Sequence, residues 1–259
     1  MRTMRFCAIV IAVFIVSQQA SAQFFGQPTT YHDFYGGNHN NGMSALMATM
    51  AWNRVFYPKA SGNGGRSTAS RSPATPASRP QPSRPTDNSA VRFRPTGTYI
   101  KTREMADELG TTPAEREQYQ KLMNSVLDAF GQQAQKGGFP NDIPAALAFF
   151  LGENIRIYRG IPDLSDQQYI NLRNTVADAL ISSGAVSNLT DRQKQEMYEA
   201  LVAYTGITQF GYEQSLNAGN REMVQGYQKV AGQSLQTVTK ISPNSMNITG
   251  DGLTASPPE

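Results

Sequence analysis

Apolar residues in the second half of the chain recur every three or four positions, which is the spacing of an amphipathic helix. The clearest stripe lies between Thr112 and Gly137 and consists of Tyr119, Leu122, Met123, Val126, Leu127 and Phe130. Thr112 with Glu115 three positions later forms a capping box, and Pro113 suits the first turn. The pattern predicts one helix that buries a single face.

Further segments carry the same periodicity between capping signals. The pair Asn141-Asp142 opens a second helix, and Gly160 with Pro162 closes it, because polar N-caps, a C-terminal glycine and a following proline are usual boundaries. Capping boxes at Ser165 and Thr190 begin two more helices, and a weaker stripe runs roughly over residues 221–238. No segment shows a convincing strand alternation. We therefore predict an all-α fold, a compact bundle of about five helices.

The second predicted helix contains the stretch AFFLGENIRIYRG, residues 148–160. It is apolar nearly all round for three turns, which is typical of a central helix in a bundle. Glu153 and Arg156 are three positions apart and can pair on one helix face. Arg159 lies at the C-terminal end, where a cation complements the exposed carbonyl groups. This interpretation makes the charged residues structural.

The alternative makes Glu153 the one candidate catalytic residue. A buried carboxyl group with a raised pKa could serve as the acid of a hydrolase that acts on an envelope polysaccharide. Such an enzyme needs a second carboxylate roughly 5–10 Å away. The sequence offers Asp163, Asp166 and Asp191, but no spacing selects one of them.

The first 22 residues have the order of a cleavable export signal. Arg2 and Arg5 precede an apolar run over residues 6–16, and the segment ends in Ala-x-Ala at Ala22. The run is too short to span a bilayer as a helix. Cleavage after Ala22 would also remove Cys7, the single cysteine. We expect a periplasmic or secreted protein without disulfide bonds.

Residues 23–58 are rich in aromatic residues, glycine and methionine, and we expect one short helix near their end. Such a segment cannot bury its apolar side chains alone. Methionine and tryptophan suit adaptable apolar contacts. The candidate partner-binding residues are Met47, Met50, Trp52 and Phe56. The expected partner is an unidentified protein or envelope component.

Residues 59–95 form a predicted disordered basic linker rich in proline, serine and arginine, with few apolar side chains. Nine basic residues face one acid, Asp87, between Lys59 and Arg103, whereas eleven basic residues face eighteen acids after that point. The linker can contact an anionic membrane surface, a polysaccharide or the acidic face of its own domain, or merely be solvated. We expect no nucleic-acid partner. The helical domain is expected over 96–242 and a flexible tail over 243–259.

Cofactor and metal sites are not expected. His32 and His39, with Asp33, are the only grouping that suggests a metal site, and they lie in a Gly/Asn-rich segment without a rigid frame. The sequence has no Gly-x-Ser-x-Gly turn and no glycine-rich phosphate loop before a helix.

Three segments together resemble an uncharacterised family of exported bacterial proteins. They are DIPAALAFFLGENIRIYRG, LSDQQYINLRNTVADAL and LTDRQKQEMYEALV, and the resemblance covers about residues 100–215. It implies a bacterial envelope or secreted setting and supplies no catalytic residues. We therefore expect a non-catalytic, envelope-associated interaction or structural protein, with the polysaccharide hydrolase as the alternative.

Overall fold

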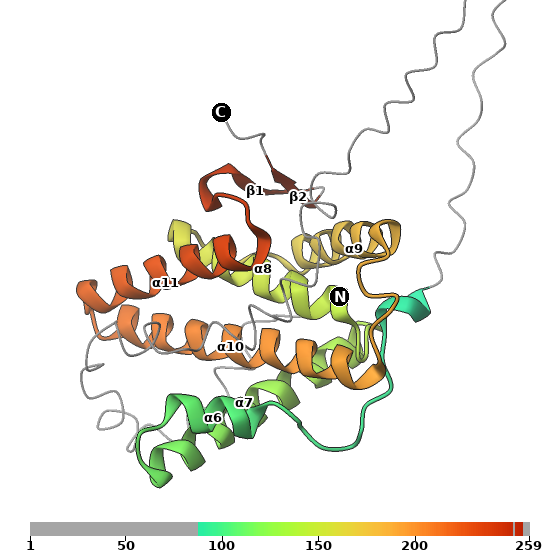
Figure 1. Ribbon diagram of the computed structural model, residues 1–259. Coiled ribbons are helices and arrows are strands. Elements are labelled where there is room, and N and C mark those ends of the chain that lie inside the picture. The colour runs from blue at the N-terminus through green and yellow to red at the C-terminus, as the bar shows by residue number, and fades with distance from the viewer. Residues whose placement is uncertain (1–87, 251, 256–259) are drawn as a thin grey trace, which may run out of the picture.

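The computed structural model describes residues 88–250 and 252–255. Within them, six α-helices and a small hairpin form the fold shown in Figure 1. The elements are η2 (Asn88–Val91), α6 (Thr102–Leu109), α7 (Pro113–Lys136), α8 (Ile143–Arg159), α9 (Asp166–Ser183), α10 (Asp191–Asn217), α11 (Arg221–Thr239), η3 (Pro243–Ser245), β1 (Met246–Thr249) and β2 (Gly252–Ala255). The predicted all-α class is confirmed.

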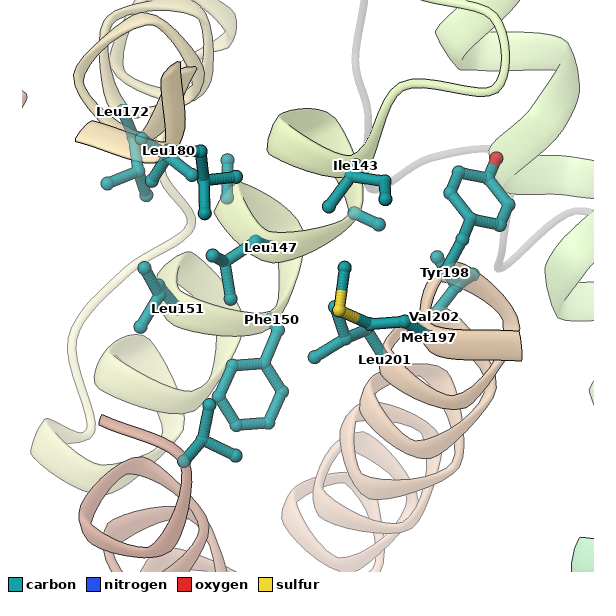
Figure 2. Close-up of a cluster of buried hydrophobic side chains, with 14 of the residues drawn as sticks. Ile143, Leu147, Phe150, Leu151, Leu172, Leu180, Met197, Tyr198, Leu201 and Val202 are labelled. Atoms are coloured by element: carbon teal, nitrogen blue, oxygen red, sulfur yellow. The ribbon is translucent and has the colours of Figure 1, made fainter. Parts of the chain in front are cut away.

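Helix α8 is the centre of the bundle and packs against α9, α10 and α11. Figure 2 shows Leu147 and Leu151 near α9, and Phe150 opposite Leu201 of α10. All four of these side chains are at most 1% exposed. Fully burying such a side chain contributes about 1.5–3 kcal/mol. The nearly continuous apolar surface of α8 therefore has a neighbouring element on each side.

The capping hydrogen bonds expected at the helix boundaries are present in the structure. Thr112, Ser165 and Thr190 each accept a hydrogen bond from the third backbone amide of their helix, and each capping box is complete. Asp142 caps α8 in the same way, and Gly160 ends it with a left-handed φ of 61°. These signals are local, so they can be read without knowledge of the tertiary structure.

Helix α6 is one more helix than the five expected. It is short and mostly polar, and only Ala106 and Thr102 are buried on it. Ala106 joins a small cluster with Met123 of α7, and with Ala203 and Ile207 of α10. With Met105 and Leu109, which pack against the same cluster, α6 has only three apolar positions, and so short a stripe is a weak signal for a helix in the sequence.

The predicted boundary of the basic linker at residue 95 is wrong, because the end of that segment belongs to the folded domain. Val91 and Phe93 are 0% and 7% exposed and lie in the main core. The Phe93 ring meets the Tyr198 ring edge-on, with centroids 5.3 Å apart. The Phe93 amide also donates a hydrogen bond to the Asn141 carbonyl oxygen, and Lys194 Nζ donates one to that of Ala90, so apolar and polar contacts together hold these residues against the bundle.

The predicted flexible tail over 243–259 also needs correction. β1 and β2 pair antiparallel, from Met246 opposite Ala255 to Thr249 opposite Gly252. Met246 is fully buried, and a Cβ on Gly252 would lie 2.2 Å from Thr175 Oγ1 of α9. Each strand has only four residues, which is too short for a visible alternation pattern.

No helix in the described part of the chain is long and apolar enough to cross a membrane. The predicted export segment 1–22, the Met-rich segment 23–58 and most of the linker 59–95 lie outside the described residues.

Candidate functional site

The last two turns of α8 bring a pair of charged side chains into the protein interior. Glu153 and Arg156 are 1% and 3% exposed. Arg156 Nε donates a hydrogen bond to Glu153 Oε2 over 2.9 Å. This pair confirms the predicted contact between positions i and i+3 of the helix. Its burial means that each charge must be balanced by protein groups.

Arg156 also contacts two carboxylates from other parts of the chain. Its terminal nitrogens lie 3.2 Å from Asp163, in the loop after α8, and 2.7 Å from Glu213 of α10. The guanidinium carbon lies 5.6 Å from the centre of the Tyr212 ring. The two outer carboxylates are 54% and 32% exposed, so they connect the buried arginine to solvent. We call Glu153, Arg156, Asp163, Glu213 and Tyr169 the Arg156 network.

Tyr169 of α9 completes the network because its hydroxyl donates a hydrogen bond to Glu153 Oε1. The ring reaches this position by lying on Gly152, where a Cβ would stand 2.6 Å from Tyr169 Cε1. The apolar spacing of α9 does not reveal this role of Tyr169, because its partner lies on another helix. A glycine directly before an acidic residue inside an apolar helix pattern, here Gly152 before Glu153, is the sequence signal that could have indicated such a close contact.

The environment of Glu153 has opposing effects on its protonation. Burial raises the pKa of Glu153 and the Asp163 charge adds to this, whereas Arg156 and Tyr169 act to lower it. Burial alone would lower the pKa of Arg156, but Glu153 and Glu213 raise it above the ordinary value. The network therefore keeps Arg156 charged while each Glu153 oxygen has its own donor.

The predicted companions of Glu153 are separated in the structure. Asp163 reaches the Arg156 network. Asp166 and Asp191 lie in the first turns of α9 and α10, where a carboxylate favours the helix dipole. Arg159 instead binds the hairpin segment, through Asn247 Oδ1 and the carbonyl oxygens of Asn244 and Met246.

A second buried ion pair joins the start of α8 to the middle of α9. Asp142 is fully buried and accepts hydrogen bonds from Arg173 Nε at 3.1 Å and from Arg173 Nη2. Arg92 approaches the same carboxylate at 3.5 Å. Asp142 also caps α8, so it fixes the helix start and the arginines together. The helix start at Asn141-Asp142 is readable in the sequence, whereas the pairing of Asp142 with Arg173 follows only from the fold.

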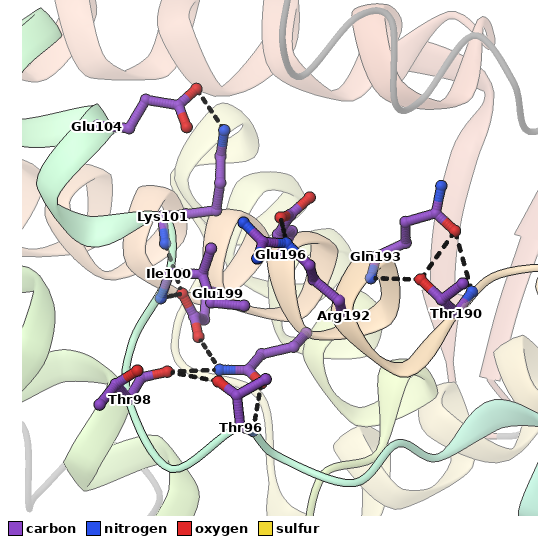
Figure 3. Close-up of polar contacts among 11 residues, drawn as sticks. Thr96, Thr98, Ile100, Lys101, Glu104, Thr190, Arg192, Gln193, Glu196 and Glu199 are labelled. Atoms are coloured by element: carbon purple, nitrogen blue, oxygen red, sulfur yellow. Dashed lines mark hydrogen bonds and ion pairs between the residues drawn. The ribbon is translucent and has the colours of Figure 1, made fainter.

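A polar face of α10 holds an extended segment, residues 94–101, which we call the strap. Figure 3 shows the contacts. Gln195 accepts from the Thr96 amide and donates to the Thr98 carbonyl oxygen, both at 2.8 Å. Glu199, only 1% exposed, accepts from the amides of Ile100 and Lys101. Gln195 and Glu199 thus bind the main chain of the strap.

Among the described residues, no group of three or more His, Cys, Asp and Glu side chains could hold a metal ion. The histidine grouping around His32 and His39 lies outside that part, as do the partner-binding candidates Met47, Met50, Trp52 and Phe56.

Comparison with known proteins gives one match. A family model, described as a family of unknown function (DUF6683), matches residues 2–256. No curated protein and no solved structure matches the chain. The match includes the segments that resemble an uncharacterised family. Because it spans nearly the whole sequence, the chain belongs to this family of unknown function, DUF6683.

Proposed function

We propose that this chain is a non-catalytic interaction or structural protein of the bacterial cell envelope. The observation that supports a non-catalytic role most directly is the saturation of Glu153. One of its oxygens accepts from Arg156 and the other from Tyr169, and the side chain is 1% exposed. A general acid must come within hydrogen-bond reach of the group that it protonates.

The raised pKa of Glu153 is the feature that it shares with a hydrolase acid. Its cause is burial, and burial also separates the carboxyl group from a polysaccharide chain. The neighbouring carboxylates Asp163 and Glu213 both form an ion pair with Arg156. Because these ionic groups bind one another inside the bundle, we assign them a structural role and place the contacts with a partner on the protein surface.

The placement in the envelope is supported by the order of residues at the N-terminus. Basic residues, an apolar run over 6–16 and a small-residue site at Ala22 are typical of export. The Met-rich segment then supplies the partner-binding residues Met47, Met50, Trp52 and Phe56. The basic linker supplies charge for an anionic membrane surface or polysaccharide.

Export can be tested with the full chain expressed in a bacterial host. We expect the recovered protein to begin at Gln23 and to occur in periplasmic, envelope or culture fractions. A matched variant, Ile11→Lys, interrupts the apolar run and should keep the full-length chain inside the cell. An unprocessed wild-type chain in the cytoplasm would contradict the proposal.

Docking can be tested by co-sedimentation of the processed protein with envelope fragments. Replacing Met47, Met50, Trp52 and Phe56 together by serine should strongly reduce the bound fraction. The matched control replaces three polar residues of the same segment, Asn38, Asn40 and Asn41, by serine and should bind normally. Equal binding of both variants would remove these four residues from the interface.

A further inference from the structure

A hollow lies between α6 and the start of α7, away from every residue of the Arg156 network. Its volume is about 310 Å³. It is an open hollow of the surface, because Ala106 is the one buried residue of its lining. The lining residues are Arg103, Ala106, Asp107, Pro113, Arg116, Glu117 and Gln120. The hollow thus combines two guanidinium groups, two carboxylates and one amide with two small apolar residues.

Arg116 is held in place by the turn that connects α6 to α7. Its Nε donates a hydrogen bond to the Gly110 carbonyl oxygen over 2.9 Å. A Cβ on Gly110 would lie 2.6 Å from both Arg116 Cγ and the Arg116 backbone nitrogen. Only glycine permits this close approach. The Nε contact orients the guanidinium plane and leaves its two terminal nitrogens available, since no described residue accepts a hydrogen bond from them.

The uncompensated charge of the hollow is positive. Glu117 is neutralised by Lys121, whose Nζ lies 2.6 Å from its carboxylate. Neither Arg103 nor Arg116 forms an ion pair within the described part of the chain. Asp107 is the one remaining carboxylate in the lining. Two guanidinium groups and one carboxylate without an ion-pair partner among the described residues leave a net charge of about +1, which favours a ligand with a single negative charge.

We propose that this hollow binds a polyhydroxylated carboxylic acid of the size of a hexuronic acid. Arginine forks match the two oxygens of a carboxylate, which gives paired charge-assisted hydrogen bonds. Arg116 and Arg103 would hold the carboxylate. Asp107 and Gln120 would bind the hydroxyl groups, because a carboxylate accepts and an amide both accepts and donates. Ala106 and Pro113 offer apolar surface to the sugar ring.

The site can be tested by titrating the full chain, labelled with ¹⁵N-arginine, with D-glucuronate. The Arg116 Nε–H group is bound to a carbonyl oxygen, so its resonance is a specific reporter. We expect this resonance to shift with saturation at one site. D-glucose, which has the hydroxyl groups without the carboxylate, should cause no shift.

Variants assign the effect to the hollow. Arg116→Gln and Arg103→Gln should each weaken glucuronate binding at least about tenfold, the loss of one charge-assisted pair. For Arg116→Gln, binding is followed by calorimetry. The Arg103 side chain forms no hydrogen bond or ion pair with another described residue, so Arg103→Gln should fold. It therefore tests the hollow even if Arg116→Gln fails to fold. Arg221→Gln, an exposed arginine on α11, is the control and should bind normally.

Three results would overturn the proposal. The first is the absence of saturable binding by the wild type. The second is unchanged affinity in Arg103→Gln together with Arg116→Gln. The third is that inorganic phosphate or the free amino acid alanine binds as tightly as D-glucuronate or more tightly. This would exclude a requirement for a carboxylate together with hydroxyl groups.

Discussion

Removing the positive charge of the Arg156 network should destabilise the protein in a pH-dependent way. The change is Arg156→Met, which keeps much of the side-chain volume. It leaves Glu153 buried at 1% exposure with Tyr169 as its remaining donor. Breaking a buried ion pair from one side costs about 3–5 kcal/mol. Asp163 and Glu213 are partly exposed and can turn to water, so Glu153 supplies most of this cost.

The sign of the pH dependence follows from the raised pKa of Glu153. Above pH 4.5, its ordinary value, the unfolded chain releases a proton that the folded protein still holds. Raising the pH through this window therefore lowers the free energy of unfolding, until Glu153 ionises in the folded state too. Without Arg156 the folded-state pKa rises further. Arg156→Met should thus be closer to wild type at pH 5 than at pH 8.

The assay is urea unfolding of the full chain, followed by circular dichroism at the two pH values. Glu153→Gln provides the matched comparison, because it removes the buried charge and keeps an acceptor for Tyr169. It should cost about 1–2 kcal/mol, the range of one buried hydrogen bond. The double variant should be more stable than Arg156→Met alone at pH 8. A double variant that is less stable than Arg156→Met would refute the reasoning.

Two further substitutions test close packing and the strap. Gly152→Ala should lower the free energy of urea unfolding by about 1–3 kcal/mol, because its Cβ would overlap Tyr169. The control Gly131→Ala in α7, whose Cβ would meet no atom within 4 Å, should be neutral or stabilising. Equal effects of the two variants would contradict the close contact between Gly152 and Tyr169. Glu199→Gln should accelerate hydrogen exchange at the amides of the strap that it accepts from. Glu196→Gln, whose side chain on α10 pairs with Arg192 instead of the strap, should leave that exchange unchanged.

The sequence predicts those parts of this fold that depend on neighbours along the chain. The capping boxes at Thr112, Ser165 and Thr190 and the stripe on α7 are local, and they fix most helix boundaries. Phe93 and the hairpin depend on contacts that join distant segments, such as the Phe93 ring on Tyr198. A pattern read within one window carries no information on such contacts.

The same distinction explains what could be predicted of the candidate site. Glu153 and Arg156 are three residues apart on one helix, so their pairing could be expected. Glu213 lies 57 positions beyond Arg156, and Tyr169 lies 16 beyond Glu153. Their roles follow only from the positions of α9 and α10 against α8.

The position of the Arg156 network explains why α8 keeps charges inside an otherwise apolar environment. Apolar contacts are non-directional, so they stabilise α8 in the core without selecting one axial position. The hydrogen bonds that Tyr169 donates to Glu153 and that Arg156 donates to Glu213 require defined distances from α8 to α9 and α10. A shift of α8 by one residue, about 1.5 Å, would break both contacts and leave the buried Glu153–Arg156 pair without its partners on α9 and α10. The network therefore links the central helix to two neighbours in one register.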